Sequence, residues 1–298
     1  MPAFSALLYG NYFLGICAVA QGVETAWLLG LPWKNVWLLH FVFAGTVLFY
    51  TYPYARKGLP VNRNPRTQWY RQHLSLVYVT QAFFAVWLAV SGLAFGLLHA
   101  EAIGKMEAWE WSLLVVFPLV GFFYYGGSVF SCRFNLRRMG WLKPFLIGFV
   151  WTGPTFVYPI LFARIQYGHH LGFSLFPCLL FLKYFMFISV LAILFDIKDT
   201  ATDTGSGLDT WVVRYGLRST LFHVTLPLSV LGVLTFLSYA FPHGFSLTRM
   251  LMILAPFGLL MLAIVSLRKP RSLLYYYVVI DGLMLAKALF GIGAVRFG

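Results

Sequence analysis

The sequence predicts an all-α membrane protein, because its composition excludes a water-soluble fold and its apolar residues fall in long runs. Hydrophobic residues make up 60% of the 298 residues, charged residues only 10%, and the mean hydropathy is +0.78. Soluble domains carry roughly a quarter charged residues. We therefore expect lipid to surround most of the chain. Spans and short loops use the whole length, which indicates a single polytopic domain over residues 1–298.

Long apolar segments recur along the whole chain. A membrane helix needs about 20 mostly apolar residues, and on this basis we expect about nine spans. They cover residues 11–31, 36–54, 74–98, 112–131, 142–163, 174–195, 217–241, 247–266 and 273–295. Proline and glycine inside them are tolerated in lipid-embedded bundles. The N-terminus lacks a basic region and a small-residue cleavage site, so we expect the first span to be retained.

The basic residues predict the orientation. A net charge of +13 often indicates nucleic-acid binding, but here Lys and Arg lie in short loops between spans, which favours membrane topology and no nucleic-acid partner. Loops 2–3, 4–5 and 8–9 contain Arg56, Lys57, Arg63, Arg66, Arg71, Arg133, Arg137, Arg138, Lys143, Arg268, Lys269 and Arg271. Because cytoplasmic loops are enriched in Lys and Arg, we expect these loops, loop 6–7 and the N-terminus in the cytoplasm, the C-terminus outside, and a bacterial inner membrane.

Four of the nine acidic residues cluster where the sixth span ends. They are Asp196, Asp199, Asp203 and Asp209. The first three are spaced i, i+3 and i+7, which places them on one face of a continuous helix. Carboxylates on one face suit Mg²⁺, which binds a few of them and keeps other positions for water and phosphate. The spacing therefore predicts a magnesium site.

The same spacing is also compatible with an ordinary solvated helix end. In that interpretation Lys198, Arg214 and Arg218 serve as counter-charges. The spacing alone does not decide between the two.

Ionisable residues also lie inside predicted spans. They are Glu24, Lys183, Asp281 and Lys287. Such residues are functional candidates by default, but an inter-helix ion pair explains them equally simply. We favour the ion pair, for example between Asp281 and a lysine of another span.

The stretch Phe195–Gly216, FDIKDTATDTGSGLDTWVVRYG, resembles the second aspartate motif of the UbiA superfamily of intramembrane prenyltransferases. Asp199 and Asp203 match its two core aspartates, and Asp196 matches the polar position before them. The segment Leu136–Pro144, LRRMGWLKP, resembles the basic element before the family's fifth span, with Arg137 and Arg138 in place of a Lys-Arg pair. The resemblance implies a bundle of about nine helices, with cytoplasmic loops 2–3 and 6–7 capping a central cavity.

The family's first aspartate motif is absent. Asn62, Arg63 and Arg66 match its N-R-x-x-R tail, but Tyr52, Ala55 and Leu59 occupy the positions of its three aspartates. In the family, two acidic motifs hold Mg²⁺ ions that bridge the diphosphate of an isoprenyl donor. Half of this site is missing here, and arginines of loop 2–3 are candidates to contact phosphate directly.

The resemblance implies a role for each matching residue. The catalytic residues are Asp199 and Asp203, the magnesium ligands are Asp196, Asp199 and Asp203, and the substrate-binding residues are Asn62, Arg63, Arg66, Arg137, Arg138 and Lys143. The implied ligand is an isoprenyl diphosphate or a polyprenyl lipid.

Two functions stay open on this resemblance. One is a Mg²⁺-dependent prenyltransferase acting within the membrane. The other is a protein of the same fold that has lost catalysis and binds lipid, or acts as a subunit among other membrane subunits. A transporter is less favoured, because the sequence contains no convincing internal repeat.

Overall fold

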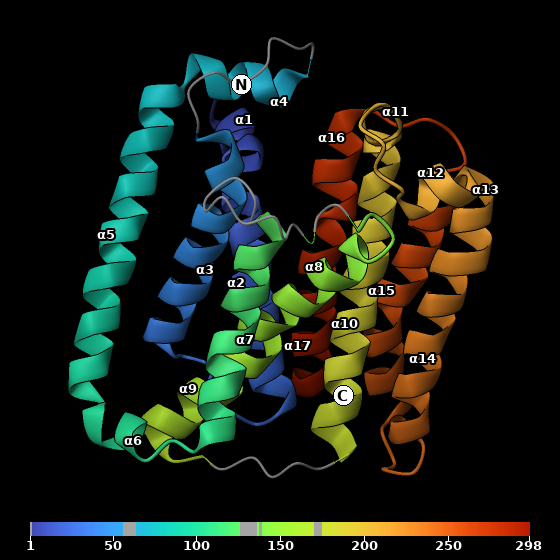
Figure 1. The fold of residues 1–298 in the computed structure, drawn as a ribbon. Helices are drawn as coiled ribbons and strands as arrows, with labels where there is room; N and C mark the ends of the chain where they lie inside the picture. The colour runs from blue at the N-terminus through green and yellow to red at the C-terminus, as the bar shows by residue number, and fades with distance from the viewer. Residues whose placement is uncertain (1, 56–63, 126–135, 137–138, 170–174) are drawn as a thin grey trace.

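The computed structural model of the chain describes residues 2–55, 64–125, 136, 139–169 and 175–298. Over these residues the chain is a bundle of helices that run mostly along one axis, with short helices across one end (Figure 1). The long helices and helical segments are α2 (Tyr12–Leu28), α3 (Val36–Thr51), α5 (Leu74–Leu98), α7 (Ala108–Tyr125), α8 (Lys143–Thr152), α9 (Tyr158–Tyr167), α10 (Leu175–Asp196), α14 (Leu226–Ala240), α15 (Leu247–Ser266) and α17 (Gly282–Arg296).

Short elements connect or extend these helices. They are α1 (Pro2–Tyr9), η1 (Tyr52–Tyr54), α4 (Pro65–Gln72), α6 (Ala100–Gly104), η4 (Gly153–Val157), η5 (Ile197–Asp199), α11 (Thr200–Gly205), α12 (Trp211–Tyr215), α13 (Leu217–Ser219), η6 (Thr220–Thr225), α16 (Leu273–Tyr275) and η7 (Tyr276–Ile280). Several join their neighbours into one continuous span. For example, α8, η4 and α9 together cover Lys143–Tyr167, and the π-helical η4 accommodates Pro154 within it.

Seven helical segments of the described chain are long and apolar enough to cross a membrane, or eight if α1 and α2, bent by 60° at their junction, form one span. The helix α7 is apolar but shorter over its described residues. Each of the nine predicted ranges therefore contains a helix, although the count of nine spans is not confirmed.

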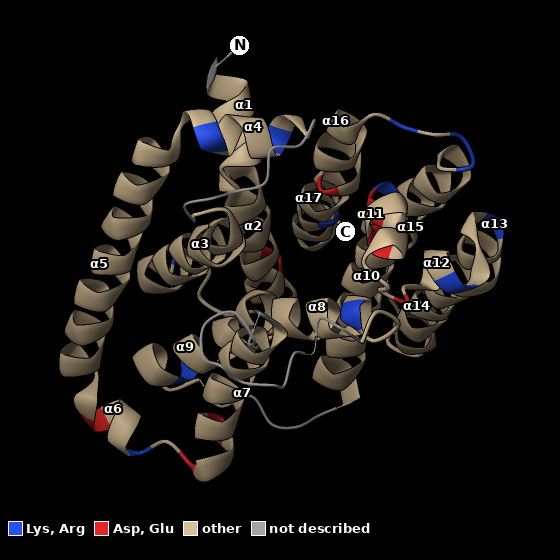
Figure 2. Cartoon of the chain, turned by 45° about the horizontal axis from the view of Figure 1, so that its top comes forward, with Lys and Arg blue, Asp and Glu red and all other residues tan. Residues whose placement is uncertain are grey.

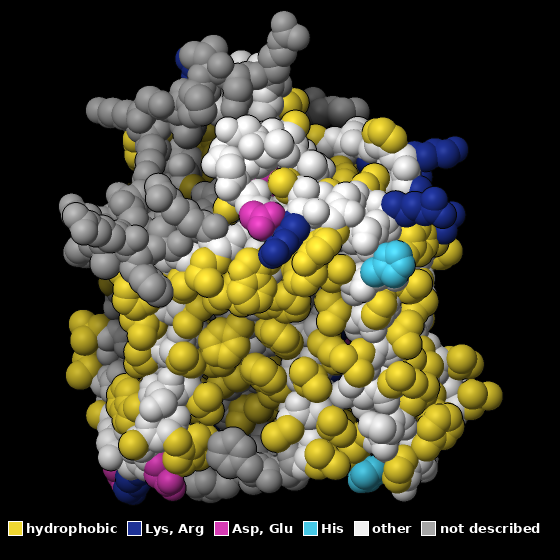
Figure 3. Space-filling model, turned by 45° about the vertical axis from the view of Figure 1, so that its right-hand side comes forward, with side chains coloured by type: hydrophobic (Ala, Val, Ile, Leu, Met, Phe, Trp, Pro, Cys, Tyr) yellow, Lys and Arg dark blue, Asp and Glu magenta, His cyan; other side chains and the backbone are white. Residues whose placement is uncertain are grey.

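The surface agrees with a membrane environment. Figure 3 shows a broad apolar band, with charged side chains at its two ends. Figure 2 shows Lys and Arg on α4, α12 and α13, at the end of the bundle that also contains α1 and α16, and residues of both charges beside α6 near the opposite end. Charged residues at both ends of an apolar bundle are expected of helices that cross a membrane. The protein is thus an integral membrane protein.

Close helix packing depends on small residues. Lipid tails are as apolar as Leu, so helices in a bilayer associate through van der Waals contact and polar interactions. At the α8–α10 contact, a Cβ on Gly148 would lie 2.9 Å from the Phe185 carbonyl oxygen. At the α2–α17 contact, a Cβ on Gly291 would lie 2.6 Å from Cγ of Glu24. These glycines bring together the helices that surround the site described below.

Candidate functional site

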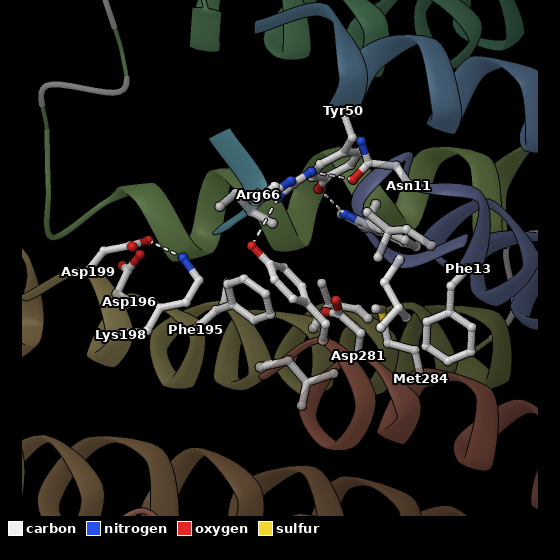
Figure 4. A pocket seen from close by; sticks show the side chains of 18 of the residues that line it. Asn11, Phe13, Tyr50, Arg66, Phe195, Asp196, Lys198, Asp199, Asp281 and Met284 are labelled. Atoms are coloured by element: carbon white, nitrogen blue, oxygen red, sulfur yellow. Dashed lines mark hydrogen bonds and ion pairs between the residues drawn. The ribbon is translucent and has the colours of Figure 1, made fainter. Parts of the chain in front are cut away.

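A cavity of about 220 Å³ opens among α1, α2, η1, α4, α8, α10 and η7–α17. Its charged and amide side chains are those of Asn11, Arg66, Lys143, Asp196, Lys198, Asp199 and Asp281. Its apolar lining includes Phe13, Leu14, Ile188, Leu191 and Met284. In Figure 4, Asp196, Lys198 and Asp199 lie toward one side, Arg66 and Asp281 lie between, and Phe13 and Met284 lie toward the other. The cavity thus has a charged side and an apolar side.

Arg66 enters the cavity from the first turn of α4. Asn64 caps this helix by accepting a hydrogen bond from the Arg66 backbone N–H at 2.9 Å, and Pro65 occupies the first helical position. Both residue types are typical of helix starts. The Arg66 guanidinium then donates to Asn11 Oδ1 at 2.6 Å and to the Tyr277 hydroxyl at 3.4 Å. Its position is therefore fixed from three elements.

Aromatic rings surround the Arg66 guanidinium. It lies 4.4 Å from the centre of the Tyr54 ring, which stacks on Tyr70. Burial by itself would lower the pKa of Arg66, but Tyr54, Tyr277 and Tyr70 raise it above its ordinary value. Burial raises the pKa of the Tyr70 phenol, which donates its hydrogen bond to the Tyr9 carbonyl at 2.6 Å. The Arg66 guanidinium therefore stays positively charged among these rings.

Asn11 depends on the break between α1 and α2. It is the only non-glycine residue in the described chain with a positive φ, 63°, a conformation that Asn tolerates better than most residues. Its amide nitrogen donates to Thr51 Oγ1 at 3.0 Å and to the Tyr70 hydroxyl at 3.2 Å, which leaves the amide oxygen for Arg66. The bend between α1 and α2 thus directs the Asn11 side chain into the cavity.

The two aspartates of the motif that line the cavity each form an ion pair. Asp196 ends α10 and pairs with Lys143 at the start of α8, and both side chains are buried. Asp199 lies on η5 and pairs with its neighbour Lys198, with 39% of the Asp199 side chain exposed. The predicted residues Arg66, Lys143, Asp196 and Asp199 therefore line one cavity.

Asp203 does not line this cavity. It lies on α11, and its side chain is buried. The expected common face assumed one continuous α-helix, but the 3₁₀ segment η5, with about 3.0 residues per turn, separates Asp196 from Asp199. Asp203 still lies close enough to Asp196 to act on it electrostatically. The predicted residues Asn62, Arg63, Arg137 and Arg138 lie outside the described residues.

The donor set fits a three-carboxylate magnesium site poorly. Among the residues that the structure describes, no three Asp, Glu, His or Cys side chains are placed to hold one metal ion. The carboxylates of Asp196 and Asp199 already face ammonium groups. This placement agrees in part with the solvated-end interpretation, since Lys198 does act as a counter-charge. Magnesium binding stays a prediction.

Sequence reasoning missed Asn11, Tyr277 and Lys198 as cavity residues. It singled out Asp281 only as an intramembrane charge and favoured an ion pair for it. Among the described residues the Asp281 carboxylate forms no ion pair, so that interpretation is not confirmed for Asp281. It is right for Glu24, which pairs with Lys287 at 2.6 Å. The signal that identified Asp281 was its charge within an apolar span.

Comparison with known proteins identifies the fold. No protein-family model matches the sequence, and no curated protein matches it. One solved structure matches the chain with a TM-score of 0.55 and 15% sequence identity, and the match covers 99% of both chains. That structure is described as "Structural and mechanistic insights into the biosynthesis of Digeranylgeranylglyceryl phosphate synthase in membranes". The fold is of the UbiA type. The UbiA-type bundle is thereby confirmed over almost the whole chain, at an identity that speaks for the fold alone.

Proposed function

We propose that the protein binds an isoprenyl diphosphate in the cavity and transfers its isoprenyl group to an acceptor within the membrane. The observation that carries this proposal is the convergence of Arg66, Lys143 and Lys198 on a cavity that also has an apolar side, within a UbiA-type fold. Fixed cations suit a diphosphate, because guanidinium and ammonium groups form short, charge-assisted hydrogen bonds with phosphate oxygens. The apolar side suits the first part of an isoprenyl chain.

The cations would also assist the reaction. When the bond between C1 of the isoprenyl group and the diphosphate oxygen breaks, negative charge grows on the diphosphate. Preorganised positive groups stabilise that charge in a site shielded from water. Arg66 is suited to this role, since its guanidinium is held by Asn11 and Tyr277 before any ligand arrives.

The charges that line the cavity indicate how a magnesium ion would affect diphosphate binding. The cavity's described lining contains three cations, Arg66, Lys143 and Lys198, and three carboxylates, Asp196, Asp199 and Asp281. These charges balance, so a diphosphate would bind more tightly with an added cation. The partly exposed Asp199 is the carboxylate best placed to meet one.

A second function is supported by the same ion pairs. Because Asp196 and Asp199 are paired with lysines and no three-residue metal site is described, the fold is also suited to holding a phosphorylated polyprenyl lipid without reaction. Such a protein would act as a lipid-binding subunit of a membrane complex. Turnover separates the two functions.

The test uses purified protein in lipid nanodiscs with radiolabelled geranyl, farnesyl and geranylgeranyl diphosphate. Binding and turnover are measured with Mg²⁺ and with EDTA, for wild type and for Arg66→Gln, Lys198→Gln and Asp199→Asn. Arg71→Gln is the matched control, because Arg71 lies on the same helix as Arg66 and is exposed.

We expect Arg66→Gln to weaken binding by about 10-fold or more, and Arg71→Gln to leave it unchanged. Tighter binding in Mg²⁺ that Asp199→Asn abolishes would support the magnesium prediction. Binding without turnover under any condition would establish the lipid-binding function. Absence of saturable binding of all three donors would refute both.

A further inference from the structure

Asp281 is placed differently from three other carboxylates of the described helices. Asp196, Asp199 and Glu24 each face a lysine ammonium group. The Asp281 carboxylate makes no ion pair or side-chain hydrogen bond with a described residue, and it lines the cavity (Figure 4). A carboxylate within lipid is costly and is retained where it has a role.

The local backbone aims Asp281 at the cavity. It lies directly after the π-helical segment η7, and its N–H donates to the Tyr276 carbonyl oxygen five residues earlier, at 3.1 Å. One extra residue in a turn rotates the next turn of the helix relative to a regular α-helix, and π-segments recur at functional sites. Tyr277 from this turn contacts Arg66, while Met284, one turn further on, lines the apolar side. Asp281 thus lies between the group proposed to hold the diphosphate and the residues proposed to hold the chain.

Two cations lie near the Asp281 carboxylate. Arg66 and Lys198 are the cations close enough to act on Asp281 electrostatically. On α2, the Cys17 thiol donates a hydrogen bond at 3.7 Å to the Asp281 backbone carbonyl oxygen. A carboxylate without a hydrogen-bond donor from the described part of the protein is suited to accept one from a ligand.

We propose that Asp281 is a catalytic residue that removes the proton from a hydroxyl-bearing acceptor; this rests on the transferase function proposed above. The acceptor oxygen forms a bond to C1 of the isoprenyl group, and the bond between C1 and the diphosphate oxygen breaks. The diphosphate leaves with the electron pair of that bond, beside Arg66. The hydroxyl proton passes to the Asp281 carboxylate.

The test compares wild type with Asp281→Asn, which keeps the side chain's shape and removes its basicity. Asp209→Asn is the matched control, because Asp209 is exposed and lies outside the cavity. Proteins in nanodiscs receive labelled geranylgeranyl diphosphate, Mg²⁺ and a set of acceptors: a long-chain alcohol, phenol, 4-nitrophenol and anisole, the methyl ether of phenol. Donor affinity, turnover and the thermal unfolding midpoint are measured for each variant.

We expect Asp281→Asn to bind donor with unchanged affinity and to lose on the order of 100-fold or more in kcat with phenol, the range typical of a general base. The loss should shrink for 4-nitrophenol, because a more acidic hydroxyl needs less help from a base. Anisole should not react. A purely structural role would instead lower turnover equally for every acceptor and lower the unfolding midpoint.

The outcomes separate the two proposals. If wild type transfers the isoprenyl group and Asp281→Asn does so at the same rate, the role of Asp281 is refuted while the transferase function stands. If wild type binds donor and transfers it to none of the acceptors, the transferase function is refuted and the role of Asp281 with it.

Discussion

Two groups of ionisable side chains lie in this bundle, and they differ in whether a ligand can reach them. The first lines the cavity and includes Arg66, Asp199 and Asp281. The second is sealed among α2, α10 and α17: Glu24 and Lys287 have side chains only 1% and 2% exposed, and their charged atoms lie 2.6 Å apart. Both groups place charges in apolar spans. Of these two groups, as far as the described residues go, only the cavity group includes a carboxylate without an ammonium partner. A residue's charge therefore does not by itself identify a functional site.

The sealed group contains further buried polar side chains besides the Glu24–Lys287 ion pair. Lys287 Nζ lies 3.1 Å from the centre of the Tyr184 ring, and the neighbouring Lys183 is also buried. Gln21 is completely buried, and neither polar atom of its amide has a partner among the residues that the structure describes. These side chains lie on the same three helices as the cavity's apolar lining. The comparison predicts that changes in the sealed group alter stability, whereas changes in the cavity group alter ligand binding.

The largest effect is expected from Lys287→Met. This change leaves the Glu24 carboxylate buried without its partner, which typically costs about 3–5 kcal/mol. We expect the free energy of unfolding, measured by chemical denaturation in detergent micelles, to fall by about that amount. The double variant Glu24→Gln/Lys287→Met should recover most of the loss.

The surface pair Asp209–Arg214 is the control for this prediction. Its charged atoms are 3.8 Å apart and its side chains are more than half exposed, so Arg214→Gln should change the free energy of unfolding by no more than about 1 kcal/mol. If Lys287→Met unfolds with wild-type free energy, the sealed ion pair does not form as described.

The next effect is expected in the cavity group, from Asn11→Gly. Glycine keeps the positive φ of this position without strain and removes the hydrogen bond from Arg66 at 2.6 Å. A hydrogen bond to a charged group contributes about 1.5–3 kcal/mol. If Arg66 needs this bond to meet the diphosphate, donor Kd should rise on the order of 10-fold. The measurement is donor affinity at a temperature where wild type and variant are both fully folded, which separates binding from stability. An unchanged Kd would show that Tyr277 and the surrounding rings suffice to hold Arg66.

The fold and half of the site can be predicted from local sequence patterns. Apolar runs of about 20 residues predict the helices because a bilayer imposes that length, and the motifs single out Asp196, Asp199, Arg66 and Lys143, which all line one cavity. The remaining residues depend on backbone irregularities that leave no mark in hydropathy. Asn11 depends on a left-handed residue between two helices, and Asp281 on a π-helical turn.

The same limit applies to the aspartate motif and to the partner of Glu24. Spacing of i, i+3 and i+7 predicts a common face only while the helix stays regular, and η5 interrupts it between Asp196 and Asp199. Glu24 and Lys287 lie 263 residues apart in the chain, so their pairing results from the packing of the first span against the last. No property of either span alone specifies that contact.

The smallest effect is expected from Gln21→Leu. The sign of its effect on the free energy of unfolding distinguishes the sealed group from the cavity group most clearly. A buried polar group without a partner costs about 1–3 kcal/mol, and replacing it with an apolar group of similar size removes that cost. We therefore expect Gln21→Leu to raise the free energy of unfolding by about 1 kcal/mol and to leave donor affinity unchanged, because Gln21 does not line the cavity.

Gln72→Leu, at an exposed position of α4, is the control and should change the free energy of unfolding by no more than about 0.5 kcal/mol. A loss of stability in Gln21→Leu would mean that its amide is hydrogen-bonded within the bundle, for example through an internal water. A loss of donor binding would mean that the sealed group and the cavity form one functional unit.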